Sequence, residues 1–260
     1  MGKLIDVITP TQIEMPRGLG KTTISECLLL YVLCCKPRKH KFGVIVSQNA
    51  RASANILKDC QRMILEPDTP FANDFPEICL PFALGGNGRK RQTYNGVETN
   101  ISNNSSQIVF PRLRLKDGTD MPTSNSVLMA KPITSCRGSK FGKYRPTICL
   151  IDDIQTAESA SNPEQVQKNM ELITKDIMNL SGQGKKLNVI LTATPLNAED
   201  LCEMIERNIN WRTIKFKAII KYPNDIESNP NDGLWYQYFS LYDSETIEEK
   251  PHTKSLEFYR

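Results

Sequence analysis

Histidine is scarce in this sequence. The 260 residues include only two histidines, His40 and His252. Because histidine is the commonest general base and a preferred zinc ligand, this count argues against histidine-dependent catalysis and against a zinc site. The eight cysteines include no C-x-x-C pair, and most lie within apolar segments. We therefore expect free cysteines that act as small hydrophobic residues, and neither a metal centre nor a disulfide framework.

A long hydrophobic run is also missing. The longest, Cys27–Cys35, is too short to cross a membrane, and the first residues lack the pattern of a signal peptide. The content of 39% hydrophobic and 24% charged residues is typical of a soluble globular protein. These features predict a cytoplasmic chain without a membrane partner, large enough for one domain with or without an appendage.

Positive charge is clustered along the chain. The net charge of +4 is too small to establish a nucleic-acid partner. Clusters of lysine and arginine can nevertheless neutralise phosphates, although a short basic run is more often a solvated turn. Charge therefore permits DNA binding without requiring it. The basic clusters lie at 36–41, 88–91, 112–116 and 137–145.

The most informative segment runs from Met15 to Thr23 and has the sequence MPRGLGKTT. It is typical of a phosphate-binding loop that leads into a helix, here Thr22–Cys35. Small residues let backbone N–H groups approach phosphate oxygens, and the helix N-terminus adds a positive dipole end. In such loops the lysine, here Lys21, reaches the β- and γ-phosphates, and the following hydroxyl binds Mg²⁺. The segment departs from the consensus at Met15, where glycine is usual.

Two apolar strands with polar ends follow the loop. The first, 147–154, ends in the adjacent carboxylates Asp152 and Asp153, and the second, 187–195, ends in threonine hydroxyls. Ligands of open α/β sheets sit at the carboxyl ends of the strands. Taken singly, each strand is better explained as buried structure followed by a polar turn. The order of loop, acidic strand and hydroxyl strand is the order expected of an ATP-hydrolysing protein.

Periodicity and turn residues predict an α/β arrangement for the remaining chain. Four prolines, at 67, 70, 76 and 81, are expected to break regular structure. We expect a core over 1–208, with 85–131 as a polar and β-rich excursion, and a C-terminal strand and aromatic lid or linker over 209–260. The aromatic cluster at 235–242 is better explained as a segment that docks on the core than as a binding site. Further strands are expected at 11–15, 42–47, 108–115, 126–131 and 211–220, and helices at 50–65, 163–180 and 199–208.

In its motifs and their order the chain resembles the ATPase portion of the large terminase subunit of tailed phages. Members of that family typically lack the first glycine of the phosphate loop and carry an arginine nearby, here Arg17. The resemblance covers about residues 11–200. It rests on the MPRGLGKT loop, on Cys136-Arg137-Gly138 before Arg145-Pro146, on Leu150-Ile151-Asp152-Asp153, and on Thr192-Ala193-Thr194-Pro195.

The resemblance implies a P-loop NTPase of the RecA-like (ASCE) type, with a mainly parallel sheet flanked by helices and a small C-terminal lid subdomain. It implies Mg²⁺-dependent ATP hydrolysis that drives double-stranded DNA into a viral capsid. The implied partners are other copies of the chain in a ring on a portal, and the terminase small subunit. The implied location is the host cytoplasm and, transiently, the procapsid portal. The family's RNase H-like nuclease is not expected within this chain, so we expect no nuclease activity from it.

The resemblance also implies residue roles. Arg17 would reach the γ-phosphate, and Asp152 would hold Mg²⁺ together with Thr22. Gln12 would contact adenine, and Thr192 would lie at the nucleotide. The remaining nucleotide contacts would come from Gly18, Leu19, Gly20, Lys21, Thr22 and Thr23.

Three further roles are catalytic. Asp153 stands where many members have glutamate and would orient the attacking water, with Glu158 as the alternative base. Thr194, with Thr192, would couple loss of the γ-phosphate to movement of the lid. Arg137 is a candidate for an arginine donated to the neighbouring subunit, and a structural ion pair explains it equally well.

Two other functions fit part of the pattern. A helicase-like ATPase would also use the acidic strand and Thr192-Ala193-Thr194, but a helicase needs a second RecA-like domain, for which 260 residues leave little room. A nucleotide-binding or DNA-clamping module without catalysis would explain the missing glycine and Asp153. ATP-dependent strand separation would favour the helicase, and tight Mg-ATP binding without turnover would favour the inactive module.

Overall fold

The computed structural model describes residues 9–85, 93–217, 233–247 and 254. The chain divides into two compact units, Met1–Phe216 and Lys217–Arg260, each described here by itself. None of the helices in the described segments is both long enough and apolar enough to cross a membrane. All eight cysteines are free, and Cys27 and Cys35 are the two that are exposed.

An eight-stranded sheet forms the centre of the first unit, in the order β10-β1-β9-β8-β2-β7-β6-β5. The strands from β10 to β7 are parallel, and β6 and β5 add an antiparallel edge. The expected mainly parallel α/β fold is thereby confirmed. The strands are β1 Thr11–Glu14, β2 Phe42–Ser47, β5 Ser102–Asn103, β6 Gln107–Val109, β7 Val127–Pro132, β8 Ile148–Asp152, β9 Asn188–Ala193 and β10 Arg212–Lys215.

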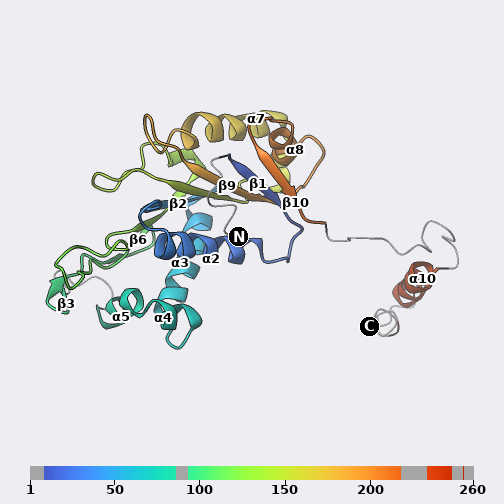
Figure 1. Cartoon of the computed structure of the whole chain (residues 1–260). Coiled ribbons are helices and arrows are strands. Elements are labelled where there is room, and N and C mark those ends of the chain that lie inside the picture. Colours follow the sequence, from blue (N-terminus) through green and yellow to red (C-terminus); the bar gives the residue numbers. More distant parts are fainter. Residues whose placement is uncertain (1–8, 86–92, 218–232, 248–253, 255–260) are drawn as a thin grey trace. The chain divides into compact units, whose positions relative to one another are not determined.

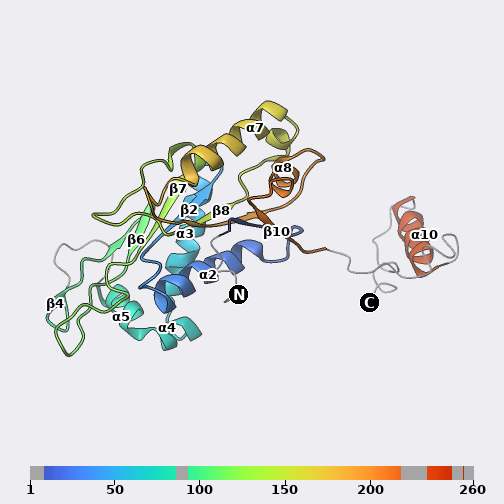
Figure 2. The same cartoon turned by 45° about the horizontal axis from the view of Figure 1, so that its top comes forward.

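Helices cover both faces of this sheet. Figure 1 and Figure 2 show α2, α3, α4 and α5 on one face and α7 and α8 on the other. Successive side chains of β2 point to opposite faces of the sheet. Ile45 packs on the face covered by α2 and α3, and Val44 and Val46 pack on the other face. The helices are α2 Lys21–Cys35, α3 Ala50–Leu65, α4 Pro70–Asp74, α5 Pro76–Gly85, α6 Ala157–Ala160, α7 Pro163–Leu172 with its π-helical continuation η2 Ile173–Ile177, and α8 Leu201–Glu206.

Side-chain caps fix where several helices begin. Asn49 accepts a hydrogen bond from the N–H of Ala52 at the start of α3. Asn162 accepts from the first N–H groups of α7, whose first residue is Pro163. Proline suits this position because its missing N–H would have had no partner within the helix. These caps confirm the helix starts expected near residues 50 and 163.

The proline-rich stretch was expected to be irregular, and that prediction was wrong. Residues 70–85 form α4 and α5. Thr69 caps α4 by accepting from the N–H of Ala72, and Pro70 and Pro76 each stand at a first helical position. Pro81 lies inside α5, where it removes one helical hydrogen bond. Burial of Ile78, Cys79 and Phe82 against the core favours the helix in spite of this cost.

The segment 85–131 is not an excursion throughout. Its last part contributes β5, β6 and β7 to the main sheet, and β7 pairs with the central strand β2. A separate hairpin, β3 Thr93–Tyr94 and β4 Val97–Glu98, precedes these strands. The short 3₁₀ helix η1 Ile133–Ser135 follows β7. The strand expected at 108–115 is confined to Gln107–Val109.

The boundary expected after residue 208 is also displaced. Strand β10 pairs in parallel with β1, so the first unit continues to Phe216. Residues 218–220 of the strand expected at 211–220 lie outside the described residues. In the second unit, α10 runs over Leu234–Ile247, and the Tyr238 ring lies 5.3 Å from that of Phe239 and 6.1 Å from that of Tyr242. Docking of this aromatic segment on the core stays a prediction.

Candidate functional site

The loop between β1 and α2 has the backbone of an anion-binding turn. Gly18 and Gly20 have φ angles of +82° and +73°, which side chains other than glycine rarely adopt. Helix α2 starts at Lys21, and no side chain caps it at Gly20. A helix start without a side-chain acceptor directs its first N–H groups outward, where a phosphate can accept from them. The N–H of Met15 anchors the loop by donating to the carbonyl of Ala193 on β9 at 3.1 Å.

Lys21 joins the loop to both polar strand ends. Its Nζ lies 2.6 Å from Asp153 Oδ2, just after β8, and donates to Thr194 Oγ1, just after β9, at 2.8 Å. An ammonium group has three donors, so these two contacts leave one. The three segments singled out in the sequence therefore meet at one side chain.

Asp152 lies beneath this contact and is buried. Thr22 donates to its Oδ2 at 3.2 Å, and Thr192 donates to its Oδ1. The register of the sheet produces the second contact, because Asp152 on β8 lies directly opposite Thr192 on β9. Burial raises the pKa of the Asp152 carboxyl, while the hydrogen bond from Thr192 opposes that rise.

The oxygens of Thr22 and Asp152 fit a magnesium ion. Mg²⁺ in nucleotide enzymes is usually bound by one or two protein oxygens, several waters and the substrate phosphates. A hydroxyl and a carboxylate 3.2 Å apart at the start of α2 provide such a donor set. Groups of three or more histidine, cysteine, aspartate or glutamate side chains suited to a metal are absent from the described part of the chain.

Asp153 has an unusual backbone. Its φ of +40° lies in the left-handed region, which few residues other than glycine, asparagine and aspartate adopt. Its N–H donates to the carbonyl of Thr192 at 3.1 Å, which ties this turn to β9. Such conformations cost free energy and persist where the surrounding structure holds them. Here the turn places the carboxylate of Asp153 against Lys21.

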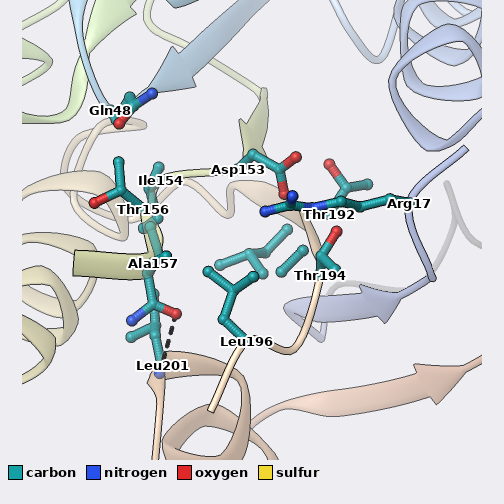
Figure 3. Close-up of a pocket in the computed structure, with 13 residues that line it drawn as sticks. Arg17, Gln48, Asp153, Ile154, Thr156, Ala157, Thr192, Thr194, Leu196 and Leu201 are labelled. Carbon is teal, nitrogen blue, oxygen red and sulfur yellow. Dashed lines mark hydrogen bonds between the residues drawn. The ribbon is translucent and has the colours of Figure 1, made fainter. Parts of the chain in front are cut away.

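A cavity of about 320 Å³ opens beside the contact between Lys21 and Asp153. Figure 3 shows Arg17 extending from the phosphate loop toward Asp153. The structure therefore places four of the expected site residues around one cavity. The lining residues are Arg17, Gln48, Asp153, Ile154, Gln155, Thr156, Ala157, Leu191, Thr192, Ala193, Thr194, Leu196 and Leu201.

Solved structures provide the comparison with known proteins, since no protein-family model and no curated protein matches the sequence. An arginine-to-alanine variant of the large terminase ATPase domain of Thermus phage P74-26 matches with a TM-score of 0.50 and 13% identity, over 91% of this chain and 86% of that one. This chain has the fold of a phage large terminase ATPase domain.

Two further matches are weaker. A second structure of the Thermus phage domain gives a TM-score of 0.49 and 14% identity, over 91% of this chain and 84% of that one. The N-terminal domain of the DNA-packaging ATPase from bacteriophage phi29 gives 0.40 and 10%, over 76% and 78%. The terminase-like fold agrees with the resemblance seen in the motifs. The roles of individual residues rest on the contacts of the site itself.

Among the expected site residues, Glu158, Arg137 and Gln12 neither line the cavity nor contact Lys21. Glu158 is exposed on α6. Arg137 is 85% exposed, and its Nε lies 4.0 Å from Asp176 Oδ1. Gln12 is buried in β1, where its amide donates to Glu14 Oε1 and to the carbonyl of Cys202. The contact of Gln12 with adenine and the catalytic roles of Glu158 and Arg137 stay predictions.

The cavity also contains residues that sequence reasoning missed. Gln48 directly follows β2, and Gln155 and Thr156 follow the acidic pair. Gln155 accepts a hydrogen bond from the N–H of Leu201 at 3.1 Å, which connects the cavity to α8 (Figure 3). The position of Gln48 at a strand's carboxyl end was a usable signal. No such signal exists for Gln155, because the packing of α8 beside it depends on long-range contacts.

Proposed function

We propose that this chain is the ATPase of a viral DNA-packaging motor, which hydrolyses Mg-ATP and moves double-stranded DNA into a capsid. One observation carries the proposal: Lys21 contacts both Asp153 and Thr194, so the phosphate loop, the acidic strand and the hydroxyl strand converge on one ammonium group. The terminase-like fold supports it. The proposed setting is a ring of copies on a portal in the host cytoplasm, with a small terminase subunit as partner.

The loop and the start of α2 would hold the nucleotide. The N–H groups at 18–23 would donate to phosphate oxygens, and Lys21 would neutralise charge at the β- and γ-phosphates. Thr22 and Asp152 would hold Mg²⁺, which when bound neutralises phosphate charge and polarises the γ-phosphoryl group. The hydrogen bond from Thr192 orients the Asp152 carboxylate for this task.

The residues around the cavity would carry the hydrolytic step. A water molecule attacks the γ-phosphorus, the bond to the β–γ bridging oxygen breaks, and ADP and phosphate leave. Asp153 would accept the proton of the attacking water, and Arg17 would stabilise the charge that develops on the γ-phosphoryl oxygens. Both residues line the same cavity. Thr194 would transmit loss of the γ-phosphate; its contact with Lys21 and its position before α8 support this role.

The test measures ATP hydrolysis per subunit against protein concentration for the wild type, Lys21→Ala and Arg137→Ala. A ring motor predicts a rate that rises with concentration and is lost without Lys21. If Arg137 acts on a neighbouring subunit, mixing the two inactive variants restores part of the rate. Lys168→Ala, at an exposed lysine on α7, is the control and should keep the wild-type rate. Hydrolysis that is unaffected by Lys21→Ala would refute the proposal.

A further inference from the structure

The edge of the sheet opposite the nucleotide site is strongly basic. Because β2, β8 and β9 are parallel neighbours, the segments that enter them lie at one edge, and Lys21, Asp153 and Thr194 lie at the other. Cations are concentrated in these entering segments. We call the following eight residues the basic edge: Lys36, Arg38 and Lys39 before β2, Lys140, Lys143 and Arg145 before β8, and Lys185 and Lys186 before β9.

Hydrogen bonds hold the three entering segments side by side. The N–H of Thr147 donates to the carbonyl of Phe42 at 2.9 Å, and the N–H of Asn188 donates to the carbonyl of Thr147 at 3.0 Å. The loops before β8 and β9 also touch, since a Cβ placed on Gly182 would lie 3.9 Å from Arg145 Cγ. The cations of the basic edge therefore belong to one continuous surface.

Acidic residues are missing from these segments. Residues 36–41, 137–147 and 178–187 contain no aspartate or glutamate. The eight cations of the basic edge exceed the net charge of +4 of the whole chain, and no acidic residue in these segments offsets them. Seven of its eight residues are exposed, and Lys36 is half-buried.

Neighbouring cations contrast with four lysines of the basic edge, whereas Arg145 of that edge donates to the carbonyls of Gly138 and Ser139. Arg112 and Arg114 both pair with Asp120, at 3.1 and 3.9 Å, and Arg137 lies 4.0 Å from Asp176. Lys41 donates to the carbonyl of Pro122 at 2.5 Å. For Lys140, Lys143, Lys185 and Lys186, by comparison, the described residues provide no carboxylate within ion-pair distance. The charge of these four lysines is therefore not neutralised by a carboxylate of the described residues, although Lys143 Nζ also lies 5.6 Å from the centre of the Tyr144 ring.

We propose that the basic edge holds the sugar–phosphate backbone of duplex DNA. The inference rests on the proposed function and identifies the surface that contacts its substrate. Neighbouring strands lie about 4.8 Å apart, so the three entering segments spread over about 10 Å, close to the width of the major groove of B-DNA, about 12 Å. Cations at this spacing can contact the phosphates that border a groove. Six of the eight are lysines, which bind phosphate as point charges and do not read bases.

Single-stranded nucleic acid fits this surface less well. Binding of single strands depends on exposed aromatic rings on which bases stack. The aromatic residues of the segment before β8 are Phe141 and Tyr144, and both are half-buried against the core. A surface of point charges without stacking rings favours a duplex of any sequence, which is the substrate that a translocating motor requires.

The experiment measures the affinity for two duplexes of unrelated sequence across a range of salt concentrations. The variant replaces Lys143 and Lys186 with glutamine. The control replaces Lys58 and Lys168, exposed on α3 and α7, so both proteins have the same net charge. Each phosphate contact contributes about 0.9 to the slope of log affinity against log salt, so the slope should fall by about 2 in the variant. It should fall equally for both sequences and stay at the wild-type value in the control.

Hydrolysis of ATP without DNA provides the second measurement. It should be the same in the wild type, the variant and the control, because the basic edge and the nucleotide site lie at opposite ends of the strands. Equal loss of DNA affinity in the variant and the control, or no loss in either, would contradict DNA binding at the basic edge. It would not contradict the proposed ATPase activity. Preference for single-stranded nucleic acid, or ATP hydrolysis without any duplex binding by the wild type, would also overturn the proposal for this edge. The comparison of ATP hydrolysis between the wild type and Lys21→Ala tests the proposed function separately.

Discussion

Lys21 Nζ lies 2.6 Å from Asp153 Oδ2, so the lysine of the phosphate loop is paired with the carboxylate that we propose as the base. The same ammonium group would have to contact the β- and γ-phosphates during catalysis. Phosphate oxygens and Asp153 therefore compete for Lys21. Because of this competition, Asp153 is expected to weaken nucleotide binding while it promotes hydrolysis, so the two effects can be measured separately.

The variant Asp153→Asn tests this competition. Asparagine has nearly the same size and tolerates the left-handed backbone at this position, but it removes the charge that holds Lys21. We expect hydrolysis to fall by about 100-fold or more through loss of the base, while Mg-ATP binds as tightly as in the wild type or more tightly. Fluorescent-nucleotide titration and single-turnover hydrolysis measure the two effects.

Glu158→Gln is the matched control for that experiment. Glu158 is exposed and does not line the cavity, so its variant should hydrolyse ATP at the wild-type rate. A large loss in Glu158→Gln with little change in Asp153→Asn would assign the base to Glu158. Weakened nucleotide binding in Asp153→Asn would contradict the competition for Lys21.

Thr192 should set the pH at which magnesium binding fails. Burial raises the pKa of Asp152, and the hydroxyl of Thr192 opposes the rise by donating to the carboxylate. Removing that hydroxyl in Thr192→Val should raise the pKa further. Because a protonated carboxyl does not bind Mg²⁺, loss of Mg²⁺-dependent nucleotide binding on acidification should begin at a higher pH.

Titrations with Mg²⁺ between about pH 5 and pH 8 measure this shift. Second-shell partners of metal ligands typically affect metal affinity by about 10- to 100-fold. Thr192→Ser keeps the hydroxyl and should follow the wild type across this range. An equal pH dependence in Thr192→Val and the wild type would show that this hydrogen bond does not tune Asp152.

The phosphate loop allows a paired glycine test. Gly18 and Gly118 have φ angles of +82° and +81°, and a Cβ at either would meet no neighbour within 4 Å. Alanine at either position should therefore cost a similar free energy of unfolding, about 1 kcal/mol, through backbone strain alone. Only Gly18→Ala should also weaken nucleotide binding, by about tenfold, because its strain displaces N–H groups of the anion-binding turn. Thermal unfolding and nucleotide titration measure the two effects, and equal nucleotide affinities in both variants would refute this role of the loop.

Local signals were sufficient for much of this fold and site. The apolar run of β2 and the cap residues Asn49 and Asn162 act over a few positions, so they can be recognised in the sequence. The convergence of Asp153 and Thr194 on Lys21 followed from a general property of parallel sheets, whose strand ends share one edge.

Features that depend on distant packing were not predictable from local signals. Helix α5 contains Pro81 and is favoured by buried neighbours from other elements. The resemblance assigned Gln12 to adenine because family members have adenine contacts upstream of the loop. Its hydrogen bond to the carbonyl of Cys202 depends on the packing of α8 against β1, for which the sequence has no local signal. The contact between Arg137 and Asp176 joins residues 39 positions apart, one in the turn after η1 and the other in η2.

Glu26 is a buried carboxyl on α2, one helical turn after Thr22. It is only 4% exposed, and burial, with added repulsion from Asp59 and Asp152, raises its pKa from 4.5 to about 7. The folded protein therefore keeps this proton at pH values where the unfolded chain has lost it. The contribution of Glu26 to the free energy of unfolding therefore falls as the pH rises from about 4.5 toward 7 and then levels off, because the unfolded state binds fewer protons than the folded state in that window.

Glu26→Gln removes this titration while keeping the shape of the side chain. Relative to the wild type, the variant should gain free energy of unfolding progressively from about pH 5, reaching about 3 kcal/mol near pH 8. Denaturant unfolding without nucleotide or Mg²⁺ measures the difference at each pH, and Glu98→Gln, at an exposed glutamate, should show no such gain. A wild type and a Glu26→Gln variant whose stabilities run parallel across this range would mean that Glu26 is ionised in the folded protein. In that case the repulsion between Glu26 and Asp152 would persist at neutral pH, where the site would have to hold both charges.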